Sequence, residues 1–260
     1  MQIREMDSKS ESFVGTCTHV EDTPQILRRE EIDLSSAQRI TWLQQMHGKG
    51  SRVKVAFSND QPVAFLHLMP IEVCPWGPIG EDLLVIPCLT VIEKAGRVGV
   101  GSQLVAEAVE EARRQGKRGL VSIGYYHDCW FMPAPFFERC GFRVAERRAE
   151  QAVLWEPFDP SVAPPRLLTP NYHYVSVSGK VVIDLFWNTF CPTSSIEAQR
   201  VREVAGEFGE AVKLNEYCAD DHRILLEFQI PRGIFINGKE IWWGHEAPKE
   251  GIRNAVLQAL

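Results

Sequence analysis

A proline-rich stretch is the feature that most limits how this chain can fold. Residues 157–170, PFDPSVAPPRLLTP, contain five prolines. Proline lacks a backbone N–H and has a fixed φ, so this stretch cannot form a helix or a central strand. We therefore predict an extended linker over residues 157–171. The linker separates a domain of residues 1–156 from a domain of residues 172–260, and both lengths are normal for domains.

The composition is that of a soluble globular protein and excludes two classes of partner. Hydrophobic residues make up 45% and charged residues 24% of the 260 residues, which is ordinary for such proteins. The formal net charge of -6 offers no basic face for nucleic acid. No apolar run approaches the roughly 20 residues that span a bilayer, and the charged N-terminus lacks the apolar core of a signal peptide. We expect a cytoplasmic protein that binds neither nucleic acid nor membrane.

The cysteines indicate free thiols. The seven cysteines are irregularly spaced and form no CxxC pair, so we expect no structural metal site. In a reducing cytosol most of them should be buried thiols.

The first predicted domain mixes strands and helices. Residues 52–73 form two apolar runs around a turn signal, which predicts a hairpin, and the apolar run 82–91 predicts a buried strand. An apolar stripe at helical spacing follows in residues 98–119. Residues 119–126 predict another strand, and residues 134–144 predict a short helix that ends at a glycine and leads into a strand.

A glycine-rich loop lies where the buried strand meets the long helix. Residues 96–105 read GRVGVGSQLV. Backbone N–H groups at a helix N-terminus have no partner inside the helix, and the helix dipole makes them favourable for a phosphate. The alternative is that Gly99 and Gly101 only permit a tight turn. The loop is neither a Walker A loop nor the G-x-G-x-x-G dinucleotide pattern.

Two motifs at the right separation resemble the GNAT acetyltransferase family over residues 10–156. They are the V-G-V-G-S loop between strand and helix and the later A-P-F-F-E-R-C-G-F. The resemblance implies an α/β (α+β) fold with a mixed, splayed central sheet, and acetyl-CoA as the cosubstrate. It also implies which residues lie at acetyl-CoA. The backbone of Leu89 and Val91 would pair with the pantetheine arm, and Phe137 and Arg139 would lie near the cofactor. The pyrophosphate would bind the loop amides of Arg97, Val98, Gly99, Val100, Gly101 and Ser102.

The sequence departs from the family at two positions. Gly96 stands where the family has Gln or Arg, with Arg97 displaced by one. Phe137 replaces the tyrosine that often protonates the departing CoA thiolate, and a phenyl ring cannot donate a proton. We expect Tyr126 or a bound water to serve instead, with Tyr125 and His127 as alternatives, unless no acid is needed.

The remaining roles in this domain are less constrained. Glu81 or Asp82, at the start of the buried strand, are the candidates for the base that takes the proton of the attacking amine, directly or through water. The aromatic stretch 127–137 either lines an acceptor pocket or packs in the core.

The second domain, residues 172–260, resembles a thioredoxin-like α/β domain. A buried strand leads into Cys191-Pro192-Thr193-Ser194 at a helix start, where the dipole favours a thiolate. This turn matches the C-x-x-C/S motif, and Pro231 matches the cis-proline that faces it. Ser194 replaces the second cysteine, so Cys191 is left with one-thiol chemistry, for which Cys218 is a candidate resolving thiol, or with a scaffold role. Together the two domains resemble the YoaP-type branch of the GNAT family.

Two functions remain after this comparison. The first is an acetyl-CoA-dependent acyltransferase that moves an acetyl group to an amine or thiol of a small acceptor. The alternative is a thiol-based redox or sensor protein that uses Cys191, with the GNAT fold only binding CoA. A homodimer is left open.

Overall fold

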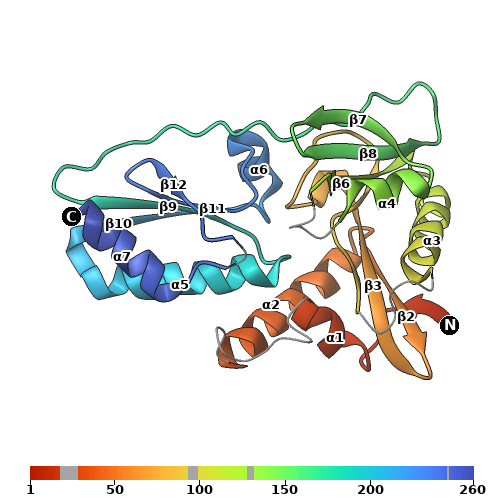
Figure 1. The fold of residues 1–260 in the computed structure, drawn as a ribbon, viewed down its shortest axis with the longest axis horizontal. Helices are drawn as coiled ribbons and strands as arrows, with labels where there is room; N and C mark the ends of the chain where they lie inside the picture. The colour runs from red at the N-terminus through yellow and green to blue at the C-terminus, as the bar shows by residue number, and fades with distance from the viewer. Residues whose placement is uncertain (18–28, 93–98, 128–131, 245) are drawn as a thin grey trace. The chain divides into compact units, whose positions relative to one another are not determined.

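The computed structural model describes residues 1–17, 29–92, 99–127, 132–244 and 246–260. The chain divides into two compact units, shown in Figure 1. The first unit comprises Met1–Thr18 and Leu43–Leu168, and the second comprises His19–Trp42 and Thr169–Leu260. Within the described residues, no helix is long and apolar enough to cross a membrane.

The first unit is built on an eight-stranded mixed sheet. Its order is β1-β2-β3-β4-β6-β8-β7, and β5 pairs with β3 off this path. Only the β4–β6 pair is parallel. The strands are β1 (Gln2–Glu5), β2 (Arg52–Ser58), β3 (Gln61–Pro70), β4 (Leu84–Ile86), β5 (Leu89–Val91), β6 (Gly119–Tyr125), β7 (Arg143–Arg148) and β8 (Gln151–Pro157). The helices are α1 (Glu11–Thr16), α2 (Arg29–His47), the 3₁₀ turn η2 (Ile71–Val73), α3 (Val100–Arg114) and α4 (Ala134–Arg139).

The boundaries of the units differ from those of the predicted domains at two places. Residues 29–42 of α2 belong to the second unit, and residues 43–47 belong to the first. Residues 158–168, assigned to the linker on the sequence, belong to the first unit. There Arg166 forms a two-way backbone bridge with Ile79, with N···O distances of 2.9 and 2.8 Å. Asp159 accepts a hydrogen bond from Arg118 at 3.0 Å.

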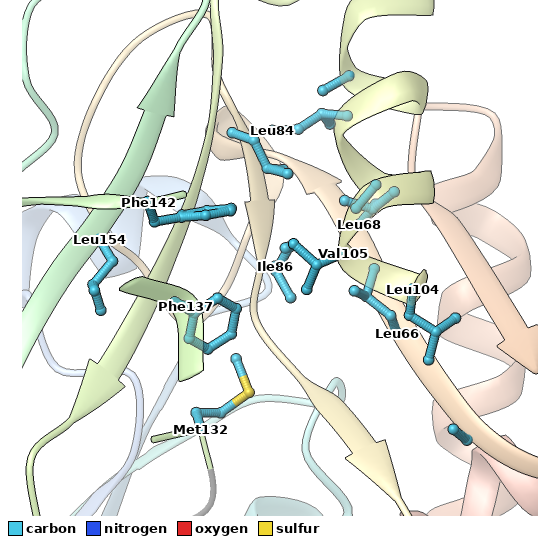
Figure 2. Close-up of a cluster of buried hydrophobic side chains, with 14 of the residues drawn as sticks. Leu66, Leu68, Leu84, Ile86, Leu104, Val105, Met132, Phe137, Phe142 and Leu154 are labelled. Atoms are coloured by element: carbon cyan, nitrogen blue, oxygen red, sulfur yellow. The ribbon is translucent and has the colours of Figure 1, made fainter. Parts of the chain in front are cut away.

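The predicted long helix is confirmed as α3, and its apolar stripe makes the main core. Leu104, Val105, Ala108 and Ala112 are buried on one side of it. Figure 2 shows Leu104 and Val105 beside the strand residues Leu66 and Ile86, and Phe137 of α4 belongs to the same cluster. Full burial of a side chain of this size contributes about 1.5–3 kcal/mol. This cluster therefore holds α3 and α4 on one face of the sheet.

The second unit contains a four-stranded sheet of order β10-β9-β11-β12. β9 and β10 are parallel, whereas β11 is antiparallel to both β9 and β12. The elements are β9 (Val181–Trp187), α5 (Pro192–Phe208), the 3₁₀ turn η4 (Gly209–Ala211), β10 (Val212–Cys218), α6 (His222–Phe228), β11 (Gly233–Ile236), β12 (Lys239–Ile241) and α7 (Lys249–Ala259). Asn237 and Gly238 form the turn between β11 and β12, and both residues have the positive φ of a tight hairpin turn, 48° and 80°.

Side chains on the two faces of β9 pack into two different clusters of the second unit. Val181, Ile183 and Leu185 belong to the cluster that α5 and α7 share with the sheet. Phe186 instead packs with an aromatic group that includes Tyr217 and Phe228. Because successive side chains of a strand point to opposite faces, this one apolar run supplies both layers.

Candidate functional site

The sheet of the first unit splits where β4 ends. β4 pairs with β6 from Leu84–Leu120 to Ile86–Ser122, and Pro87 follows. Proline cannot donate a ladder hydrogen bond, and β5 pairs only with β3. The hydroxyl of Ser122 donates to the carbonyl of Ile86 at 2.9 Å, at the last paired position. Beyond this point β5 and β6 diverge, which leaves a splay between them.

On the side of β5 that faces the splay, the backbone polar groups pair with no other described strand. Cys88 and Ile92 bond toward β3, since Cys88 O accepts from His67 N and Ile92 N donates to Val63 O, both at 3.0 Å. Backbone groups of successive residues in a strand alternate in direction. The N–H and C=O groups of Leu89 and Val91 therefore face away from β3, and Leu89 N lies 3.3 Å from the sulfur of Met132. An extended ligand in the splay can pair with these groups.

The glycine-rich loop forms the amino end of α3. Gly99 is the N-cap residue in the left-handed conformation, with φ +78°, and no side chain caps the helix. The first helical bond runs from Gln103 N to Gly99 O at 3.1 Å. The N–H groups of Val100, Gly101 and Ser102 therefore have no acceptor within the helix, as an anion site requires. Arg97 and Val98 lie outside the described residues.

The loop and the splayed strand lie close together. A Cβ atom added to Gly101 would be 3.2 Å from the ring of Phe136 and 3.8 Å from Cδ2 of Leu89. The thiol of Cys140, at the end of α4, lies 3.7 Å from the hydroxyl of Ser102. The fold thus brings β5, the first turn of α3 and α4 to one place, although they are well separated in sequence.

The candidate proton donor Tyr126 lies on the α4 side. Its hydroxyl donates to Oε1 of Glu138 at 3.0 Å, and the guanidinium of Arg147 lies 3.8 Å from its ring centroid. Burial and the nearby Glu138 raise the pKa of Tyr126. The phenol therefore keeps its proton at neutral pH, as a proton donor requires.

Of three other predicted site residues, one is buried in the core and two are exposed to solvent. Phe137 is fully buried within the cluster of Figure 2, between the rings of Phe136 and Phe142 at centroid distances of 5.1 and 5.6 Å. Arg139 is exposed in the last turn of α4. Glu81 is exposed and precedes β4 at its amino end, whereas the splay opens at the carboxyl end of that strand.

A small pocket borders the splay near the end of β4. Its lining comes from the end of β4, from β6 and from the chain on either side: Trp76, Gly77, Val85, Pro87, Ile123, Tyr125 and Met132. Tyr125 is largely buried, which raises its pKa, and its hydroxyl accepts from Gln151 at 3.2 Å. The position of Tyr125 at the end of β6 could be predicted from the sequence. That a pocket lies beside it depends on residues from other elements, which the sequence around Tyr125 does not indicate. Residues 128–131 of the aromatic stretch lie outside the described residues.

The turn around Cys191 is held by Asn188 in the second unit. Cys191 is the N-cap residue of α5 and is partly exposed, and its N–H donates to Oδ1 of Asn188 at 2.9 Å. The Asn188 amide N–H donates to the hydroxyl of buried Ser194 at 3.0 Å. Its side chain donates to the carbonyl of Pro231 at 2.8 Å.

The prediction of a cis bond before Pro231 is wrong. The described residues contain one cis peptide bond, Gly77–Pro78, so the Ile230–Pro231 bond is trans. The segment faces the Cys191 turn through the carbonyl of Pro231, which Asn188 binds. Among the described residues, no group of three His, Cys, Asp or Glu side chains is placed to hold a metal ion.

The family model described as acetyltransferase (GNAT) family matches residues 18–142. The match covers the splay, the glycine-rich loop and α4. The chain therefore carries a GNAT-family acetyltransferase domain, and the predicted mixed α/β fold with a splayed sheet is confirmed.

Several solved structures of acetyltransferases are similar to part of this chain at low sequence identity. An N-acetyltransferase from Staphylococcus aureus Mu50 is 15% identical with a TM-score of 0.46, over 61% of this chain and 98% of that one. A GNAT family acetyltransferase from Brucella melitensis in complex with acetyl-CoA is 15% identical, over 63% and 92%, with a TM-score of 0.42. The PaiA N-acetyltransferase from Thermoplasma acidophilum in complex with coenzyme A is 13% identical, over 60% and 98%, with a TM-score of 0.43. No curated protein sequence matches the chain.

Proposed function

We propose that this protein transfers the acetyl group of acetyl-CoA to an amine or thiol of a small acceptor. The observation that carries the proposal is that two backbone surfaces, the side of β5 turned away from β3 and the first turn of α3, lie close together. The pantetheine amides would bond to Leu89 and Val91 as an added strand. The pyrophosphate would accept hydrogen bonds from the loop of residues 97–102.

The reaction needs correct placement and two proton transfers. The acceptor nitrogen attacks the thioester carbonyl, the C–S bond breaks, and the electron pair leaves with sulfur as the CoA thiolate. Tyr126 would protonate this thiolate, with Glu138 holding its hydroxyl in place. Glu81 lies at the amino end of β4, away from the splay, so the proton of the attacking amine would pass to solvent water rather than directly to this carboxylate.

Acetyl-CoA turnover with a panel of small amines and thiols tests this function. CoA release should depend on one acceptor class, and Tyr126→Phe should lower kcat about tenfold. This loss is below the usual range for a general acid because water can replace the phenol. Arg147→Lys is the control that keeps a cation near the ring but leaves the hydroxyl. Absence of turnover with every acceptor, in a protein that binds acetyl-CoA, would favour the sensor alternative.

We further propose that the second unit is thioredoxin-like and uses Cys191 as a thiol. Its strand order, with a parallel first pair and an antiparallel second pair, supports this proposal. The thiol begins α5 and is partly exposed, so the helix amides favour its thiolate. The chemistry would be a mixed disulfide, because Ser194 cannot close a disulfide within the turn.

Cys191 is expected to alkylate before the buried cysteines in the native protein. Burial raises the pKa of Cys74 to about 12, and burial together with Asp220 raises that of Cys218 to about 12. Both thiols are therefore protonated at neutral pH, whereas alkylation needs the thiolate. A brief iodoacetamide reaction followed by mass spectrometry measures the order. Equal labelling of Cys191 and Cys74 would leave this unit as a scaffold.

A further inference from the structure

A second pocket of the first unit, of about 300 Å³, is unrelated to the splay. It opens between the end of β1, the start of α1, the last turn of α2 and the start of β2. Met6, Leu43 and Val53 form its apolar wall. Its size reaches the lower end of the range for small-molecule sites. None of its lining residues belongs to β4, β5 or α3, so the pocket is separate from the proposed acetyl-CoA site.

Most of the charges around this pocket are already compensated. The carboxylate of Glu5 lies 2.6 Å from Nζ of Lys54. The guanidinium of Arg52 donates to the carbonyl groups of His47 and Ser51 at 3.1 and 2.7 Å, and its Nε lies 3.8 Å from Glu111. Neither Glu5 nor Arg52 therefore presents an unpaired charge to a ligand.

Glu11 differs because its charge has no cation beside it. Its Oε1 accepts a hydrogen bond from the amide of Gln44 at 2.9 Å. Within the part of the chain that the structure describes, no Lys, Arg or His forms an ion pair with this carboxylate. A carboxylate that is partly shielded from water and lacks a counter-ion favours a bound cation.

Ser51 supplies the second observation. This residue is 2% exposed and lines the pocket, and its hydroxyl oxygen is buried with no hydrogen-bond partner in the described residues. A buried hydroxyl without a partner costs free energy. A donor group of a ligand would satisfy it.

We propose that this pocket binds a small primary alkylammonium compound. The ammonium group has three donors, which suit the carboxylate of Glu11 and the hydroxyl of Ser51. The alkyl chain would lie on Met6, Leu43 and Val53. A carboxylate or phosphate ligand is disfavoured, because the one uncompensated charge of the pocket is negative.

Titration calorimetry with n-butylammonium chloride tests this site in the full-length protein without acetyl-CoA. All titrations are run at one pH and ionic strength, so that the variants differ only in the substituted side chain. We expect binding of n-butylammonium and none of n-butanol. Glu11→Gln keeps the shape and removes the charge, so it should weaken binding about tenfold or more. Ser51→Ala should weaken it by a smaller factor.

The matched control is Glu107→Gln, an exposed carboxylate on α3 outside the pocket, which should leave the affinity unchanged. Thermal unfolding shows whether each variant is folded. If Glu11→Gln does not fold, Ser51→Ala carries the test alone. Two results would overturn the proposal: no n-butylammonium binding by the wild type at about 10 mM, a very weak affinity, or equal affinity in Glu11→Gln, Ser51→Ala and the control.

Discussion

Gly101→Glu should weaken acetyl-CoA binding by about a hundredfold or more, so that binding is no longer measurable. A like charge within the amide cradle and a side chain in the path of the pyrophosphate both oppose the cosubstrate. The Cβ alone would approach the Phe136 ring to 3.2 Å. The longer side chain must therefore turn toward the N-terminus of α3, where the phosphates are proposed to lie. Calorimetry with acetyl-CoA measures the loss.

Ala106→Glu is the matched control for this variant. Ala106 is exposed on the same helix, so the substitution adds the same charge outside the first turn. It should bind acetyl-CoA with nearly wild-type affinity. Unchanged affinity in a folded Gly101→Glu protein would show that the pyrophosphate does not lie on this loop.

Phe137→Ala should lower the free energy of unfolding by about 3–5 kcal/mol, the usual cost of removing a fully buried phenyl ring. The ring of Phe137 has no solvent exposure and points into the cluster of Ile86, Met132 and Phe142 in Figure 2. Phe137→Tyr should cost about 1–3 kcal/mol, because its hydroxyl would enter an apolar cluster without a partner. Denaturant unfolding measures both values.

The tyrosine variant also bears on the missing acid. If the buried phenol cannot reach the thiolate, Phe137→Tyr should not raise turnover. Phe136→Tyr is the control for stability, because Phe136 is only partly buried and its added hydroxyl can reach water. A gain of about a hundredfold or more in turnover by Phe137→Tyr, on the scale of general acid catalysis, would show that the wild type lacks an effective acid.

Several elements were predictable because their signals are local. The apolar stripe of residues 104–112 defines α3 by its period alone. Gly99 adopts a positive φ at the start of that helix, and Asn237-Gly238 adopts the backbone of a tight hairpin. Each of these features depends on a few neighbouring residues, so no distant contact is needed to read it.

Other features needed distant contacts. Residues 158–168 carry the prolines of a linker, yet Arg166 pairs with Ile79 and Asp159 with Arg118, which attach them to the first unit. The Phe-Phe pair of α4 has no sequence signal for which ring is buried, and packing buries Phe137 completely.

The sequence by itself determined the family of the first domain, the glycine-rich loop at a helix start and the position of Cys191 at another. These are patterns of residue type and spacing, which local backbone chemistry translates directly into turns and helix ends. Only the tertiary structure decided that Leu89 and Val91 turn their backbone groups toward the splay, and that Glu11 and Ser51 share a pocket. Strand pairing and packing join residues far apart in the chain, and no short stretch of sequence records these partners.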